Sequence, residues 1–123
     1  MTTDPITTDD RYTVDQFIPE VAHLVANETD AHVLVREVET RLSRLMADDG
    51  IPEEFCTAPP DRNTDDERYG FHVYRIHRAP NDAFNLTTAV WPPGVATGVH
   101  DHGGHWLVEG VYRNRLRLVD YER

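Results

Sequence analysis

Two histidines separated by a single residue, His100 and His102, have the spacing in this chain that best suits metal chemistry. Side chains alternate between the two faces of an extended strand, so these imidazoles would point the same way and Asp101 the other way. Two neutral imidazoles on one face can bind iron, zinc, nickel, copper or manganese. The spacing predicts a metal site; the alternative is a chance pair in a polar loop, since the chain has seven histidines.

The residues before this pair extend the pattern, which reads Phe84-Asn85-Leu86, Trp91, a Pro92-Pro93-Gly94 turn and His100-Asp101-His102. At these spacings they resemble the first sequence motif of the cysteine dioxygenase-like proteins, the thiol dioxygenases of the cupin superfamily. The resemblance is strongest from Tyr69 to Tyr121. It extends more weakly back to about Val14 and includes the acidic segment from Pro52 to Phe55.

The resemblance implies a mainly β fold, a partial cupin barrel (double-stranded β-helix or jelly-roll) that follows two N-terminal α-helices. It also implies an enzyme that holds Fe(II) through His100 and His102 and oxidises a small thiol carboxylate with O2 to its sulfinate. In that family an arginine on the first strand binds the substrate carboxylate with its planar guanidinium. Arg75 stands at about the matching place and is our first choice, with Arg78 as the alternative. Either could instead be an ordinary exposed arginine.

The family's third metal ligand is a histidine on a later strand, and this sequence stops at Arg123 before such a strand. His105, His72 and His77 are candidates within the chain, and a second copy of the chain could supply the ligand instead. His72 and His77 should lie on opposite faces of the first strand, so that only one points inward. On a regular strand His105 faces away from the pair, and all three are more commonly structural or surface residues.

Two other classes of function stay open at this point. One is a catalytically silent or truncated domain that binds a metal or a small acid without turnover. The other is a small interaction domain whose apolar helix stripe binds a partner. The sequence favours the enzyme because turn, spacing and flanking strands occur together.

The charge of the chain excludes some partners. Its 22 acidic residues outnumber 12 basic ones, all of them arginine, which gives a net charge of −10. Nucleic acids and anionic membranes need cationic surfaces, so neither is an expected partner. An acidic surface without lysine would suit a high-salt cytoplasm. The single cysteine, Cys56, excludes an internal disulfide, and no long apolar run predicts export or membrane insertion, so we expect a cytoplasmic protein.

The chain divides into a disordered tail over 1–12, a helical segment over 13–50, a loop over 51–68 and the barrel portion over 69–123. Apolar residues at helical spacing predict helices from about Val14 and from Ala31 to Ala47, the second stopped by Gly50. A partial barrel leaves strand edges unpaired, which predicts a homodimer. The expected strands of the barrel portion are Tyr69–Arg78, Phe84–Trp91, Val99–Tyr112 and Arg115–Tyr121.

Overall fold

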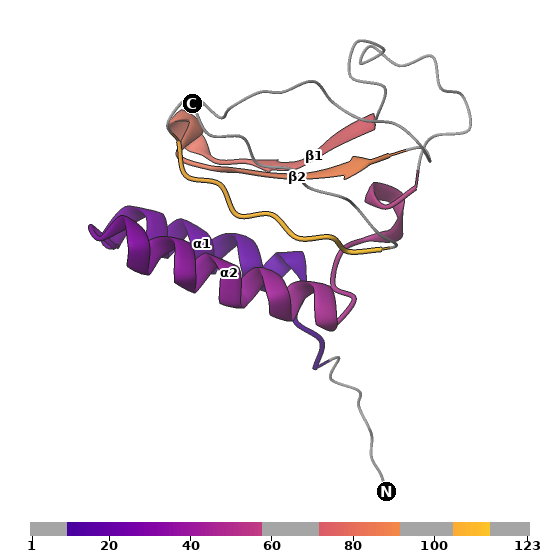
Figure 1. Ribbon diagram of the computed structural model, residues 1–123, viewed down its shortest axis with the longest axis horizontal. Helices are drawn as coiled ribbons and strands as arrows, with labels where there is room; N and C mark the ends of the chain where they lie inside the picture. The colour runs from indigo at the N-terminus through magenta and orange to yellow at the C-terminus, as the bar shows by residue number, and fades with distance from the viewer. Residues whose placement is uncertain (1–9, 58–71, 92–104, 114–123) are drawn as a thin grey trace, which may run out of the picture.

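The computed structural model describes residues 10–57, 72–91 and 105–113 (Figure 1). Two α-helices lie side by side in one layer, and a β-hairpin lies over them as the second layer. In chain order the elements are α1 (Val14–Asn27), α2 (Ala31–Ala47), the 3-10 helix η1 (Glu53–Phe55), β1 (His72–Arg78), the 3-10 turn η2 (Pro80–Asp82) and β2 (Asn85–Val90).

The start of α1 follows from its capping residues. Thr13 has an extended backbone, and its N–H donates a hydrogen bond of 2.7 Å to Oε1 of Gln16, as in a capping box. One turn later, Phe17 and Val21 are buried. The helix therefore begins where the sequence predicted and turns its apolar stripe inward.

Both ends of α2 are closed by hydrogen bonds. Asp30 caps its N-terminus by accepting bonds from the N–H groups of His32 and Val33. At the C-terminus Asp49, with φ of 57°, takes the left-handed conformation, and its N–H donates to the carbonyl of Met46. The N–H of Gly50 donates 2.9 Å to the carbonyl of Leu45, which completes a Schellman motif.

Gly50 is required by close approach. A Cβ atom placed on it would lie 2.0 Å from the carbonyl oxygen of Tyr12 and 2.9 Å from Cδ1 of Leu45. The start of α1 thus packs directly on the end of α2. Two backbone N–H groups join these ends, that of Tyr12 to Oδ2 of Asp48 at 2.8 Å and that of Val14 to the carbonyl of Gly50 at 3.3 Å.

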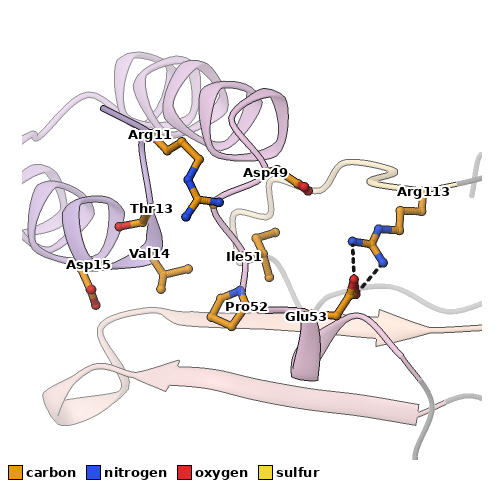
Figure 2. Close-up of a pocket in the computed structure, with 10 residues that line it drawn as sticks. Arg11, Thr13, Val14, Asp15, Asp49, Ile51, Pro52, Glu53 and Arg113 are labelled. Carbon is orange, nitrogen blue, oxygen red and sulfur yellow. Dashed lines mark hydrogen bonds and ion pairs between the residues drawn. The ribbon is translucent and has the colours of Figure 1, made fainter. Parts of the chain in front are cut away.

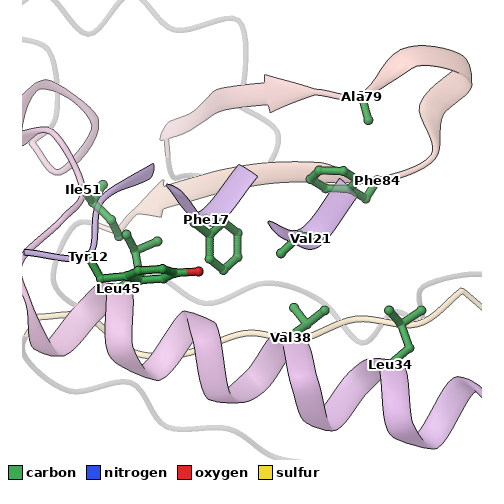
Figure 3. Packing of buried hydrophobic residues seen from close by; sticks show 9 residues of the cluster. All are labelled: Tyr12, Phe17, Val21, Leu34, Val38, Leu45, Ile51, Ala79 and Phe84. Atoms are coloured by element: carbon green, nitrogen blue, oxygen red, sulfur yellow. The ribbon is translucent and has the colours of Figure 1, made fainter. Parts of the chain in front are cut away.

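The core lies between the helices and the hairpin (Figure 3). Tyr12, which the sequence assigned to the tail, is only 4% exposed and packs edge-to-face on Phe17. Its burial places the last residue of the expected tail in the core. The buried residues are Tyr12, Phe17, Val21, Leu34, Val38, Leu45, Ile51, Ala79 and Phe84, so the predicted helical stripes do face inward.

The hairpin pairs β1 with β2 in antiparallel register, with a bulge between Arg75 and His77. Its helix-side face packs on η1. The hydroxyl of Thr88 donates to the carbonyl of Phe55 at 2.6 Å, and that of Tyr74 donates to the carbonyl of Thr57 at 2.6 Å. These bonds fix which face of the hairpin meets the rest of the protein and which face remains exposed.

The prediction of a mainly β cupin barrel is wrong for the part of the chain that the structure describes. There, helices account for 48% of residues and strands for 17%, in a single two-stranded sheet that does not close. A barrel requires each strand to pair on both sides, and the described residues provide only one strand pair. The helices supply most of the core instead. None of the described helices is long and apolar enough to cross a membrane.

The described end of the expected strand Val99–Tyr112 is not a strand. Residues 105–112 run between the helices and the hairpin and form no backbone hydrogen bond within the structure described (Figure 1). Side chains hold the segment in place. Trp106 and Val108 line a small cavity of about 40 Å³ with helix and hairpin residues, Gly110 packs against Met46, and Arg113 forms an ion pair of 2.7 Å with Glu53.

Candidate functional site

The two histidines of the predicted metal site, His100 and His102, lie outside the described residues. Within residues 10–57, 72–91 and 105–113, no three histidine, cysteine, aspartate or glutamate side chains come together to hold a metal ion. The described part of the predicted site is the substrate-binding side, on β1.

Arg75 is exposed on the face of the hairpin that points away from the helices. Val73, 38% exposed, shares this face, and the register places Thr87 across from Arg75 and Ala89 across from Val73. Arg75 forms no hydrogen bond or ion pair with any described residue. A guanidinium in this state has its planar fork available for a carboxylate ligand.

Arg78, the alternative candidate, has its guanidinium fork engaged. Nε and Nη2 both bond the carboxylate of Asp82 in the hairpin turn, the second at 2.9 Å. The hydrogen bond from Arg78 lowers the pKa of Asp82, and the charge of Arg75 acts in the same direction. The same pairing raises the pKa of Arg78. Of the two candidate arginines, Arg75 therefore has the guanidinium that is more accessible to a carboxylate ligand.

The candidate third ligands within the chain do not share a face with Arg75. His72 packs its ring 4.3 Å from that of Tyr74, and His77 packs 5.6 Å from the ring of buried Phe84. Both histidines are half-buried on the helix side, whereas His105 is exposed. The sequence predicted opposite faces for His72 and His77. That prediction is wrong because the bulge between Arg75 and His77 shifts the alternation by one residue.

His72 nevertheless has one unusual feature. Its Nδ1 atom is buried and has no hydrogen-bond partner among the described residues, and the same is true of the Tyr112 hydroxyl. An unpartnered buried polar atom costs about 1–3 kcal/mol, so both groups weaken rather than strengthen the helix side of the hairpin. Among the described residues, they belong to no group of three or more histidine, cysteine, aspartate or glutamate side chains that could hold a metal ion.

Cys56 is half-buried, and its Sγ–H donates 3.6 Å to the carbonyl of Pro52. Burial raises the pKa of this thiol, so it stays protonated near neutral pH. A protonated thiol is a poor nucleophile.

A separate hollow of about 390 Å³ opens where the start of α1 meets residues 49–53 (Figure 2). Two guanidiniums and three carboxylates line it, and one of the guanidiniums, that of Arg113, is bonded to Glu53 by two hydrogen bonds of 2.7 and 3.1 Å. Because the charges are mixed and partly paired, the hollow selects neither an anion nor a cation. It contains none of the residues that the sequence predicted to bind metal or substrate.

No family model matches the sequence, and no solved structure matches the fold. The case for a function therefore stands on the residues themselves. Arg75 was a candidate from the sequence, whereas Thr87, the residue opposite it, was not singled out. Finding Thr87 requires the cross-strand register, which the bulge in β1 obscures in the sequence.

Proposed function

We propose that this protein is an iron-dependent thiol dioxygenase that converts a small thiol carboxylate and O2 into a sulfinate. Fe(II) is held by His100 and His102, and Arg75 binds the substrate carboxylate. The His-x-His spacing and its flanking residues motivate the proposal. We further propose a cytoplasmic location, because the chain has one cysteine and its net charge is −10.

The observation that carries the proposal is the exposed guanidinium of Arg75, which forms no hydrogen bond or ion pair with any described residue. In a chain with 22 acidic and 12 basic side chains, carboxylate partners are plentiful. Among the described arginines, Arg41, Arg44, Arg78 and Arg113 each form an ion pair with a carboxylate, whereas neither Arg36 nor Arg75 forms one with a described residue. Of these two, Arg75 lies on the exposed face of the hairpin opposite a neutral threonine, where a small anionic ligand can reach it.

The reaction balances without a further reactant. A thiol and one O2 molecule give one sulfinic acid, so that sulfur loses four electrons, oxygen gains them, and the thiol proton is released with the sulfinate. Bound Fe(II) supplies the redox chemistry that brings the two reactants together. Arg75 neutralises the carboxylate and orients the substrate, which lowers the entropic part of the barrier.

A second candidate function is a domain that binds a metal or a small acid without turnover. The sequence offers only two histidines at the spacing of the predicted metal site, and a metal held by two ligands would be bound more weakly than one held by three. A homodimer in which a second copy donates a third ligand would restore the enzyme. The helix stripe does not support a docking function, because Phe17, Val21 and Val38 are buried in the core.

The test is anaerobic iron loading followed by oxygen uptake with cysteine or 3-mercaptopropionate. We expect stoichiometric iron, substrate-dependent oxygen consumption and loss of both in His100→Ala and His102→Ala. Arg75→Gln should raise KM for the thiol carboxylate. Arg36→Gln is the matched control, since Arg36 is exposed on α2 and makes no side-chain bond with a described residue. Iron binding without oxygen uptake would support the second candidate instead.

A further inference from the structure

Thr87 lies directly across from Arg75 in the antiparallel pair, and both are exposed on the face away from the helices. Residues opposite each other in such a pair have Cβ atoms about 4.5–5.5 Å apart. A hydroxyl and a guanidinium at this spacing can bond the same carboxylate. The hairpin thus presents two donor groups to one small region of solvent.

The adjacent threonine, Thr88, provides a comparison, because its hydroxyl is hydrogen-bonded within the fold. Thr88 points to the helix side and donates 2.6 Å to the carbonyl of Phe55, which makes it part of the fold. Thr87 forms no hydrogen bond with any described residue. Two consecutive threonines therefore have different roles, one structural and one with its hydroxyl still available.

The next cross-strand pair on this face is apolar. Val73 and Ala89 face each other, two residues along from Arg75 and Thr87. Two residues of a strand span about 6.6–6.8 Å, the length of a short carbon chain between a carboxylate and a terminal group. The face therefore fits a ligand with a carboxylate at one end and a short apolar body.

We propose that Thr87 is a specificity-determining residue that binds a small monocarboxylate together with Arg75. This inference rests on the proposed function for the identity of the substrate, a thiol carboxylate of about three carbons. The Arg75 fork supplies two hydrogen bonds and the Thr87 hydroxyl a third. Val73 and Ala89 contact the methylene body. Thiols without a carboxylate are poor ligands, because they cannot accept the hydrogen bonds of Arg75 and Thr87.

Propionate is the probe, because it has the carboxylate and the carbon chain but no thiol and needs no metal. Binding to the full chain is followed by NMR titration of the backbone amides of β1 and β2. We expect Thr87→Val to weaken propionate binding by about three- to tenfold, the fold-change that one hydrogen bond confers. Thr87→Ser should restore it, and Arg75→Gln should abolish it.

Thr88→Val is the matched control, the same chemical change one residue away. We expect it to lower stability through loss of the bond to Phe55 and to leave the propionate affinity unchanged. Unchanged affinity in Thr87→Val, or no propionate binding to the native chain, overturns the inference. A third outcome separates the two proposals. If Thr87→Val weakens propionate binding but the protein takes up no oxygen with any thiol, the proposed enzyme is wrong and the carboxylate site is supported.

For an active enzyme, kinetics give a second readout. Thr87→Val should raise KM for 3-mercaptopropionate with little change in kcat, and should leave KM for cysteamine, which has no carboxylate, unaltered. A merely structural role would alter both substrates alike, and that result would count against Thr87.

Discussion

The phenolic hydroxyl of Tyr12 donates a hydrogen bond of 3.0 Å to Oε1 of Glu20, two turns along α1. The same oxygen accepts a bond of 3.1 Å from Nε of Arg41 on α2. The guanidinium carbon of Arg44, also on α2, lies over the Tyr12 ring at 4.7 Å from its centroid. Tyr12 thus joins both helices, and its chemistry should be visible in the stability of the fold.

The first prediction concerns alkaline pH. Burial, followed by the bond to Glu20, raises the pKa of Tyr12 to about 12. An unfolded tyrosine ionises near pH 10, so the stabilisation is complete below about pH 10 and is lost as pH rises toward 12. Urea unfolding should show a falling free energy of unfolding across this window. Tyr12→Phe should be less stable by about 1 kcal/mol at pH 8 and show a smaller fall. Parallel curves for the two proteins would contradict this role.

A second prediction tests the turn after α2. Gly50→Ala should destabilise the protein by about 3 kcal/mol or more, because its Cβ would meet the backbone of Tyr12 rather than a flexible side-chain end. Asp49→Gly, one residue earlier, should stabilise it by about 0.5–1 kcal/mol, because Asp49 is in the left-handed region. Both values come from urea denaturation. A loss of stability in Gly50→Ala would show the effect of close packing, and a gain in Asp49→Gly would show the effect of backbone conformation.

The third prediction concerns the core. Leu45 is fully buried, so Leu45→Ala should cost about 2–5 kcal/mol through lost burial and the cavity left behind. Val33, on the same helix but 37% exposed, provides the control, and Val33→Ala should change stability by about 0.5 kcal/mol or less. Similar losses in the two variants would mean that α2 does not pack as described.

A fourth prediction follows from the net charge of −10. Added salt screens repulsion among the excess carboxylates, with the Debye length falling from about 10 Å at 0.1 M to 3 Å at 1 M. The exposed ion pairs that salt also weakens contribute only about 0–1 kcal/mol each. The thermal midpoint should therefore rise with KCl concentration. Maximal stability in dilute buffer would refute the suggestion of a high-salt adaptation.

Local sequence signals predicted the local structure well. The apolar spacing predicted the start of α1 at Val14 and both ends of α2, at Ala31 and Ala47, as the structure has them. Such features depend on neighbours within a few residues, which the sequence displays directly.

Long-range contacts were not predictable in the same way. The burial of Tyr12 depends on residues 36 positions away, and the bulge between Arg75 and His77 depends on pairing with β2. The expected third strand failed over residues 105–112 because the alternation of side chains does not show whether a partner strand is present. For the site, Arg75 could be chosen from sequence, whereas Thr87 required the register.

The bond from the Tyr12 N–H to Asp48 has a consequence for how the protein opens. It joins the entrance of α1 to the exit of α2, 36 residues apart, so neither helix has a loose end on that side from which to fray. Fraying is the cheapest route by which amide protons exchange with solvent. With that route closed at this side, amide exchange in the first turn of α1 and the last turn of α2 requires the two joined ends to separate together.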